Sequence, residues 1–527
     1  MRFNDSVARR FVVSLLLSAF VAAACTYTAI AQDDPTLVRV QGGKVHGTTA
    51  NGVIVFKGIP YAAPPVGKLR WRVPQPPVPW SGVREADKFG PACMQTDDVA
   101  KSEDCLFLNV WRPAATPVQP YPVMVWIHGG AMVHGSSTIY PGDALAAQGV
   151  VVVTLNYRMG RLGFFAHPAL AAEAPNDVRG NYGYMDQLAA LKWVQSNIAA
   201  FGGDPKQVTI FGESAGGGSV LVHLVSPMSR GLFVRAIAES PGTPGGRAKV
   251  IPSTDLATAE KMAVDWAQSV GVTGTGPTAL DQLRALPVTT LLEGTSGQQT
   301  LAALAAGKTP PGMAMSIIDG RFLTEPVETA LAAGHQVPVP VIVGANDRDL
   351  GLGLANSKDQ IFAIFGPDAD AARKLYDPLG DQTLDELKQQ VFADKTMTEP
   401  ARNIANLIAR SGQPVYLYRF AYVNEVARGK IMGTQHGFEI PFILDLPGAL
   451  VQGKATPNDK IMGAWASAYW VQFGKTGDPN GGNLPEWPRH DPSADRLMHF
   501  TNSGLIIGTD PLKPRLDLWE AVWKRSR

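Results

Sequence analysis

The chain has 527 residues, of which 45% are hydrophobic, and its formal net charge at pH 7 is +1. That length is ample for a large buried core, and the nearly balanced charge argues against a nucleic-acid partner. Beyond the N-terminal segment, no stretch is long and apolar enough to predict a stable membrane span.

The first 31 residues have the pattern of an export signal. Arg9 and Arg10 precede an apolar run, and Ala29-Ile30-Ala31 fits a small-residue cleavage site, so the mature chain is predicted to begin at Gln32. A rival interpretation is a lipoprotein signal in which Cys25 is lipidated. We favour simple cleavage, because an alanine stands three residues before that cysteine where a bulky aliphatic residue is usual. The expected location is therefore secreted or periplasmic.

Cleavage at this point leaves two cysteines, Cys93 and Cys105. An even pair of cysteines in an exported chain favours one disulfide bond. The alternative, two unpaired buried thiols, fits an oxidising compartment less well.

Several segments have the patterns of strands and helices. An antiparallel hairpin and a proline-stiffened stretch are expected over residues 36–80, and a surface loop containing Trp487 over 479–491. The predicted strands are 106–110, 123–127, 150–155, 208–211, 235–240, 339–343 and 415–420, and the predicted helices are 186–200 and 459–473.

The order of these segments predicts the fold class. Continuous apolar strands such as 123–127 and 150–155 suit a sheet that is covered on both faces. Alternating strands and helices imply an α/β fold with a mostly parallel central sheet. We expect a single domain over 32–527, with a mostly helical, lid-like insertion at about 244–338.

The segment Gly212-Glu213-Ser214-Ala215-Gly216 follows the predicted strand 208–211 and precedes a segment that can be helical. A Gly-x-Ser-x-Gly unit at such a junction is typical of the nucleophile elbow of α/β-hydrolases. A phosphate-binding loop or an ordinary turn is the plain alternative. The candidate partners of Ser214 decide between these interpretations.

A serine nucleophile needs a base, and the base needs an orienting carboxylate. In α/β-hydrolases the chain order is Ser, then Asp or Glu, then His. His436 is favoured because Gly437 beside it suits a loop. Asp347 and Asp349 both follow the predicted strand 339–343, and their spacing does not choose between them. The other histidines considered after Ser214 are His223, His335, His490 and His499.

An oxyanion hole needs backbone N–H groups from two places. One is Ala215, directly after the serine. The other is a glycine-rich turn after an earlier strand, and His128-Gly129-Gly130-Ala131 follows strand 123–127. His128 precedes the serine in the chain, so we assign it to the turn.

Together these motifs resemble the type-B carboxylesterases, over nearly all of the mature chain. The matching motifs are Gly58-Ile59-Pro60-Tyr61-Ala62, Leu69-Arg70-Trp71, Ser102-Glu103-Asp104-Cys105-Leu106-Phe107-Leu108-Asn109-Val110, Asn156-Tyr157-Arg158, Phe201-Gly202-Gly203-Asp204-Pro205, and the segments around His128, Ser214 and His436. The resemblance implies an α/β-hydrolase fold, a serine esterase acting on a small-molecule ester, and no metal or organic cofactor.

The resemblance also assigns residues. It implies that Ser214 is the nucleophile and His436 the base. Counting five residues from Gly344 places Asp349 where the family usually has a glutamate. The remaining implied roles are oxyanion donors (Gly130, Ala131, Ala215), a buried polar network (Glu213, Ser240, Glu439), structural ion pairs (Arg70 with Glu103, Arg158 with Asp186) and a Cys93–Cys105 disulfide.

The segment between the two cysteines indicates which esters are disfavoured as substrates. Cholinesterases have a longer loop there, with a tryptophan that holds the choline cation, whereas here eleven residues separate Cys93 and Cys105 and none is Trp. Choline esters are therefore disfavoured, because the cation–π contact is absent. One alternative is a specialised esterase for a large polar ester, such as a tricarballylate-bearing mycotoxin or a feruloyl ester. A non-catalytic adhesion-type relative is disfavoured by the intact Ser214 and His436.

Overall fold

The computed structural model describes residues 34–242, 252–351 and 353–525. The predicted export signal, with Cys25 and the cleavage site, lies outside the described residues.

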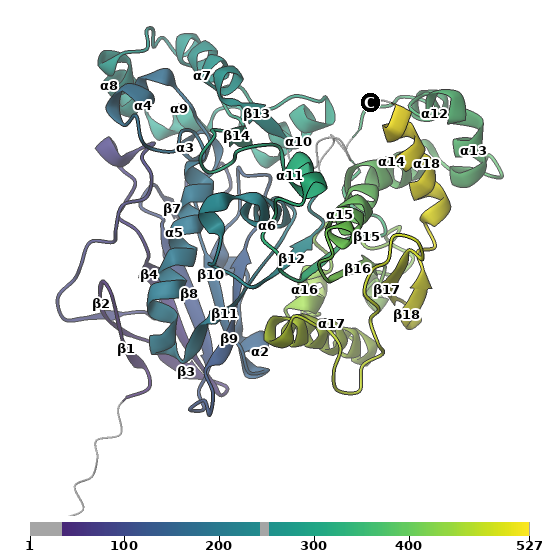
Figure 1. Cartoon of the computed structure of the whole chain (residues 1–527), viewed down its shortest axis with the longest axis horizontal. Helices are drawn as coiled ribbons and strands as arrows, with labels where there is room; N and C mark the ends of the chain where they lie inside the picture. Colours follow the sequence, from purple (N-terminus) through teal and green to yellow (C-terminus); the bar gives the residue numbers. More distant parts are fainter. Residues whose placement is uncertain (1–33, 243–251, 352, 526–527) are drawn as a thin grey trace, which may run out of the picture.

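A large mixed β-sheet forms the centre of the molecule (Figure 1). Its strands, from one edge to the other, are β18 (Gly504–Thr509), β17 (Arg496–Thr501), β16 (Val415–Phe420), β15 (Val341–Asn346), β12 (Arg235–Glu239), β11 (Gly203–Glu213), β9 (Tyr121–Ile127), β10 (Val151–Leu155), β8 (Phe107–Pro113), β4 (Val53–Pro60) and β3 (Thr48–Ala50). The strands from β17 to β10 run parallel to one another, and the pairs nearer the two edges are antiparallel. The predicted mostly parallel sheet is thus confirmed.

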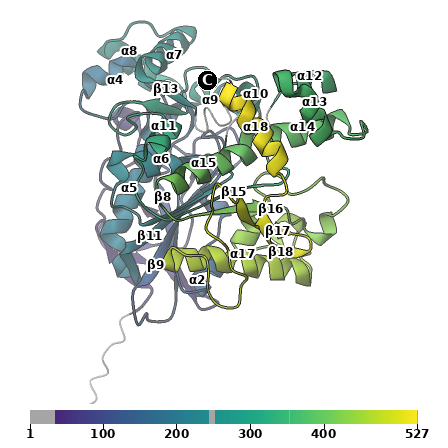
Figure 2. The same ribbon diagram turned by 45° about the vertical axis from the view of Figure 1, so that its right-hand side comes forward.

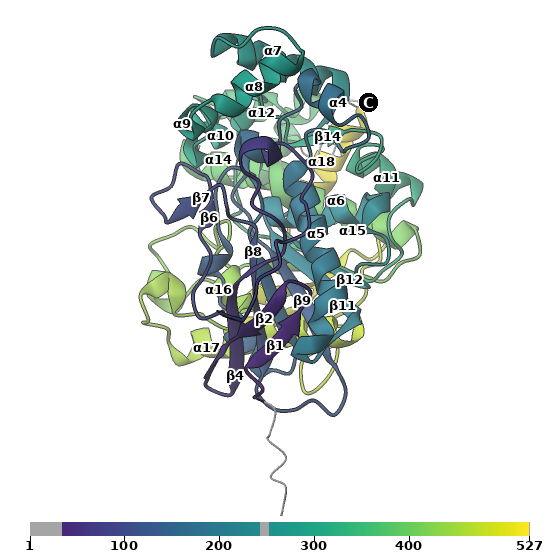
Figure 3. The same cartoon turned by 90° about the vertical axis from the view of Figure 1, so that its left-hand side faces the viewer.

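Alternate residues of the central strands enter two separate apolar cores. Val123 and Val125 of β9 pack in one core, whereas Met124 and Trp126 pack in the other. The first core also holds side chains of α5 (Tyr182–Asn197), α6 (Ala215–Val225) and α15 (Glu399–Arg410). The second holds those of α2 (Asp143–Ala147) and α17 (Pro457–Thr476). Figure 3 shows α5 and α17 on opposite sides of the sheet, as the double-sided burial of these strands requires.

A long insertion separates β12 from β15. Its helices are α7 (Leu256–Ser269), α8 (Pro277–Ala285), α9 (Val288–Leu292), α10 (Gly297–Ala305) and α11 (Val327–Ala333), and a short parallel pair joins β13 (Ser253–Asp255) to β14 (Ser316–Ile318). Side-chain caps begin two of the helices, with Asp255 accepting from Thr258 N and Ser296 forming a capping box with Gln299. Helices α7 to α10 gather at one end of the sheet, at the top of Figure 1.

Two smaller units complete the fold. The predicted N-terminal hairpin is present as β1 (Leu37–Val40) and β2 (Gly43–His46), which pairs with β5 (Val83–Glu85). Near the C-terminus, α18 (Lys513–Arg525) packs with helices at one side of the molecule (Figure 2). Those helices are α12 (Lys358–Ala363), α13 (Ala369–Tyr376) and α14 (Leu384–Ala393).

The prediction for residues 479–491 is wrong in one respect. The segment is irregular as expected, but Trp487 is fully buried and donates from Nε1 to the carbonyl of Leu417, 3.0 Å away. The indole fills the core beneath α17, so this segment covers the sheet instead of forming a purely superficial loop.

Candidate active site

Ser214 lies at the turn between β11 and α6. Its φ of 59° and ψ of −123° are unusual for a residue with a side chain, and backbone strain of this kind is concentrated at functional sites. The turn is tight because a Cβ added at Gly216 would lie 2.0 Å from the carbonyl oxygen of Ile127. Ser214 N donates to Glu239 O at 2.9 Å, which ties the elbow to the end of β12.

His436 joins the serine to a carboxylate. Its Nε2 lies 2.8 Å from Ser214 Oγ and its Nδ1 lies 2.5 Å from Asp349 Oδ1. The carboxylate only accepts, so Nδ1 carries the proton and Nε2 is left to accept from the serine hydroxyl. The imidazole is about a fifth exposed, at 21%. Asp349, His436 and Ser214 therefore form one continuous hydrogen-bonded chain.

The other candidate histidines lie elsewhere in ordinary structural settings. His223 is buried in α6, where its ring bonds to Ser229 Oγ and Gln187 Oε1. His490 pairs with Asn406 Oδ1, and His335 lies near the surface beside Glu325. His499 is a residue of strand β17.

The two candidate acids have different roles in the same loop. Asp349 is buried and also accepts from Ser240 Oγ at 2.7 Å and from the backbone N–H of Asn346 at 2.9 Å. Burial opposes the charge of Asp349, but His436 and these donors lower its pKa overall. Asp347 instead accepts from Thr434 N at 2.8 Å, and burial raises its pKa. Asp347 thus fixes the loop that carries His436 and does not contact the imidazole.

The turn after β9 holds its peptide groups in fixed directions. His128 Nδ1 bonds to Gly129 O at 2.8 Å, and Gly130 O accepts from Val133 N and His134 N at 3.0 and 3.1 Å. In a planar trans peptide unit the C=O and the N–H point in opposite directions. The N–H groups of Gly130 and Ala131 therefore point opposite to the carbonyls of Gly129 and Gly130, and the hydrogen bonds to those two carbonyls fix the directions of the N–H groups.

This turn also uses rare backbone conformations. Gly130 has a φ of 101°, and a Cβ there would lie 1.9 Å from His134 O, so only glycine fits. Ala131 and Met132 have φ values of 51° and 60°. The ring of His128 stacks on that of Tyr157, with 4.4 Å between the ring centroids. Burial lowers the pKa of His128 to about 4. A neutral, buried His128 fits the role in the turn that the sequence assigned to it.

Further carboxyl groups surround His436. Glu213 Oε1 lies 3.2 Å from His436 Nε2, and Glu439 Oε2 accepts from Asn346 Nδ2 at 2.5 Å. Glu239 accepts from the indole N–H of Trp470 at 2.7 Å. The sequence pointed to Glu213, Ser240 and Glu439, but it did not point to Asn346, Glu239 or Trp470.

This cluster determines the charge near the imidazole. Burial is the main cause that raises the pKa values of Glu213 and Glu439 to about 8, while the positive charge of a protonated His436 acts against that rise and favours both carboxylates. Burial alone would lower the pKa of His436, but the carboxylates of Glu213 and Asp349 outweigh burial and raise it. The imidazole thus loses its proton at a higher pH than an isolated histidine does.

A mostly apolar pocket opens beside Ser214 and contains about 510 Å³ of empty space including its mouth. The helical insertion supplies part of its wall through Leu301 and Leu304 of α10. The lining residues are Ala131, Met132, Tyr184, Ser214, Ala215, Gly218, Pro241, Gly242, Pro252, Leu301, Leu304, Met315, Leu350 and Met397. None of these described lining side chains carries a formal charge.

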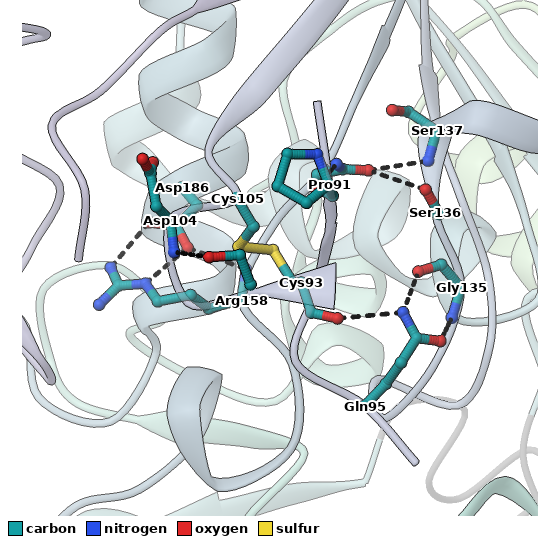
Figure 4. Close-up of a disulfide and its surroundings, with 12 residues drawn as sticks. Pro91, Cys93, Gln95, Asp104, Cys105, Gly135, Ser136, Ser137, Arg158 and Asp186 are labelled. Carbon is teal, nitrogen blue, oxygen red and sulfur yellow. Dashed lines mark hydrogen bonds and ion pairs between the residues drawn. A yellow bond between two sulfur atoms is a disulfide. The ribbon is translucent and has the colours of Figure 1, made fainter. Parts of the chain in front are cut away.

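Framework contacts implied by the sequence are present around the site. Arg70 Nη2 lies 2.6 Å from Glu103 Oε1, and Arg158 Nη2 lies 2.7 Å from Asp186 Oδ1. Cys93 and Cys105 form a disulfide, shown in Figure 4 with the nearby Arg158–Asp186 pair.

In residues 34–242, 252–351 and 353–525, no cluster of three or more His, Cys, Asp or Glu side chains could hold a metal ion. Within those same ranges, no helix combines the length and apolar character needed to cross a membrane.

The fold and the site define an α/β-hydrolase, and comparison with known proteins identifies the family. A model of the carboxylesterase family matches residues 34–519. The chain is 36% identical to the fumonisin B1 esterase of Sphingopyxis macrogoltabida over 95% of this chain and 94% of that protein. It is also 35% identical to the para-nitrobenzyl esterase of Bacillus subtilis, over 90% of this chain and 96% of that protein. The identity to the cocaine esterase of Homo sapiens is 35% as well, over 92% of this chain and 89% of that protein. The chain belongs to the carboxylesterase family and is a carboxylic ester hydrolase.

Proposed function

We propose that Ser214, His436 and Asp349 are the catalytic residues of this esterase and that it works through an acyl-enzyme. Ser214 Oγ attacks the ester carbonyl while His436 Nε2 takes the hydroxyl proton, and Asp349 stabilises the imidazolium. His436 then gives the proton to the leaving alcohol. A water molecule, deprotonated by the same imidazole, releases the acid and restores the serine. The observation that carries this proposal is the chain of hydrogen bonds from Asp349 through His436 to Ser214.

The oxyanion that forms during each attack needs hydrogen-bond donors. We assign this role to the backbone N–H groups of Gly130, Ala131 and Ala215. Support comes from the fixed peptide units of the turn after β9 and from the position of Ala215 at the first turn of α6, where the helix dipole favours negative charge. Ser240, Glu213 and Glu439 would support the imidazole and its acid without taking part in bond making.

A direct experiment tests the assignment of the nucleophile. An organophosphate reacts covalently with an activated serine, so it should label one site per chain, and peptide mass spectrometry should locate the label on Ser214. Ser214→Ala should abolish both labelling and turnover. A label at another residue, or a Ser214→Ala enzyme of normal activity, would disprove the proposal.

The pocket beside Ser214 favours, as substrate, an ester with an apolar acyl or alcohol group. The described residues of its wall are mostly methionine, leucine, alanine and proline, which bind apolar groups, and none of these described residues is a cation that could pair with a carboxylate. The second candidate is a large polar ester, which is favoured by the 36% identity to a protein named fumonisin B1 esterase.

A substrate panel separates these candidates. We expect kcat/KM for p-nitrophenyl esters to rise from acetate to medium-chain acids, because each methylene that enters an apolar pocket contributes up to about 0.8 kcal/mol. Fumonisin B1 should be a poorer substrate than the best of these esters. A much higher kcat/KM for fumonisin B1 would instead favour the specialised enzyme.

We further propose that the protein is secreted or periplasmic. The export-signal pattern over residues 1–31 and the Cys93–Cys105 disulfide support this location. N-terminal sequencing of exported protein should begin at Gln32, whereas recovery of a lipidated Cys25 from membranes would contradict it.

A further inference from the structure

Gln95 lies in the segment that the disulfide closes, between β6 (Ala92–Cys93) and β7 (Lys101–Ser102). Its side chain comes from a different part of the chain than any residue assigned above to the reaction. It is nevertheless almost completely buried, with an exposed fraction of 2%. A buried amide needs hydrogen-bond partners for its donors and its acceptor. The partners of Gln95 are backbone groups, and they show which part of the chain its side chain fixes in place.

The amide of Gln95 clamps one residue of the turn after β9 (Figure 4). Gly135 N donates to Gln95 Oε1 at 3.0 Å, and Gln95 Nε2 donates to Gly135 O at 2.9 Å. The same nitrogen donates to Cys93 O at 3.1 Å, next to the disulfide. Both backbone polar groups of Gly135 are thus fixed by one side chain, which is itself fixed to the disulfide-bonded strand.

Gly135 in turn packs on the peptide unit that presents the Gly130 amide. A Cβ added at Gly135 would lie 2.6 Å from His128 Nδ1 and 2.8 Å from Gly129 O. These two atoms form the hydrogen bond that directs the Gly129–Gly130 peptide. The φ of 115° at Gly135 allows this close approach, which a side chain would prevent.

We propose that Gln95 is a positioning residue for the oxyanion hole, and that the Cys93–Cys105 disulfide anchors it. Gln95 holds Gly135, Gly135 packs on the His128–Gly129 hydrogen bond, and that bond directs the N–H of Gly130. The inference rests on the proposed function, in which this N–H stabilises the oxyanion. Without the clamp, the turn can relax and the donor moves away from the developing charge.

The main test is Gln95→Met, which keeps the length of the side chain but removes all three hydrogen bonds. Small displacements of catalytic groups cost up to about 100-fold in rate, so kcat for a short p-nitrophenyl ester should fall roughly 10- to 100-fold. A trifluoromethyl ketone forms a hemiketal with the serine and places a full negative charge in the oxyanion hole. Its affinity should fall by a similar factor, while that of the matching methyl ketone, which remains largely unreacted, should change little.

Gln195→Met is the matched control. Gln195 Nε2 also donates to two backbone carbonyls, those of Pro205 and Leu232, at 2.8 and 3.0 Å, but it lies on α5 outside the turn. This variant should lose comparable thermal stability while keeping the wild-type kcat and the wild-type preference for the trifluoromethyl ketone. A purely structural role of Gln95 would make the two variants alike, and that result would overturn the inference.

A second variant covers the case in which Gln95→Met does not fold. Cys93→Ser combined with Cys105→Ser leaves the glutamine in place but releases its anchor. It should show the same selective loss of trifluoromethyl ketone affinity, to a smaller extent. Unchanged selectivity in a folded double variant would contradict the role of the disulfide anchor. If the wild-type enzyme formed no adduct at Ser214 at all, the proposed function would fail, which is a distinguishable result.

Discussion

The two sides of Ser214 are built from different chemical groups. On one side lie backbone amides, which are directed by hydrogen bonds to Gly129 O and Gly130 O and by the rare φ values of the turn. On the other side lie side chains, with His436 surrounded by Asp349 and Glu213. The first side depends on geometry alone, whereas the second also depends on protonation.

This difference has a functional consequence. Backbone N–H groups do not titrate in the range where histidine and carboxyl groups do. A defect on the amide side should therefore lower the rate by the same factor at every pH. A change in the carboxyl cluster should instead move the pH at which the enzyme becomes active. Three substitutions test this separation, in order of decreasing effect.

Asp349→Asn should produce the largest loss. An asparagine cannot stabilise the imidazolium and favours the wrong tautomer of His436, a change that costs on the order of 10⁴ in kcat. Asp347→Asn is the control, because Asp347 bonds to Thr434 N and not to the imidazole. Steady-state kinetics on one p-nitrophenyl ester measures both. If Asp347→Asn were the severe variant, the assignment of the acid would be wrong.

Gly130→Ala should produce an intermediate loss. The new Cβ would lie 1.9 Å from His134 O at a φ of 101°, so the turn must shift and misplace its amides. Loss of one oxyanion donor costs about 10² to 10³ in kcat. Gly202→Ala is the control, because Gly202 also has a positive φ, of 78°, but its new Cβ would make only ordinary contacts, the nearest with Pro117 Cγ at 3.4 Å, and this variant should keep its kcat. Equal activities for the two variants would argue against an oxyanion role for Gly130.

Glu213→Gln should produce the smallest effect at the optimum and a clear change in pH dependence. Only neutral His436 can accept the serine proton, so activity rises as pH increases through the pKa of His436. The carboxylates raise that pKa, so the wild-type midpoint should lie above the ordinary value of about 6.5. Removing the Glu213 charge should move the midpoint to lower pH by about one unit. Glu439→Gln, which removes a weaker influence on His436, should shift it less.

Local patterns in the sequence predicted the main features of the fold. The apolar run at 123–127 and the elbow around Ser214 carry their signals within a few residues, and they became β9 and the β11–α6 turn. Trp487 shows where this fails. A proline- and glycine-rich stretch suggests a surface loop, but the burial of its indole depends on the distant strand β16 and helix α17.

The same limit applies to the site. Asp347 and Asp349 lie in one loop, and their spacing alone does not choose between them. The family resemblance pointed to Asp349, and the structure shows the physical reason, a turn in which Asn346 N donates to Asp349 and the carboxylate reaches His436. The Trp470–Glu239 bond joins residues 231 positions apart, so no local pattern could predict it. The role of Gln95 could not be predicted either, because its hydrogen bonds to Gly135 form only when the disulfide segment folds against the turn after β9.

The pH dependence of kcat/KM, measured in parallel for wild type, Gly130→Ala and Glu213→Gln, tests the separation of the two sides most directly. We predict that Gly130→Ala lowers the plateau by about 10² or more and leaves the midpoint in place. Glu213→Gln should move the acid midpoint downward and change the plateau much less. A midpoint that moves in Gly130→Ala, or one that stays fixed in Glu213→Gln, would contradict the account.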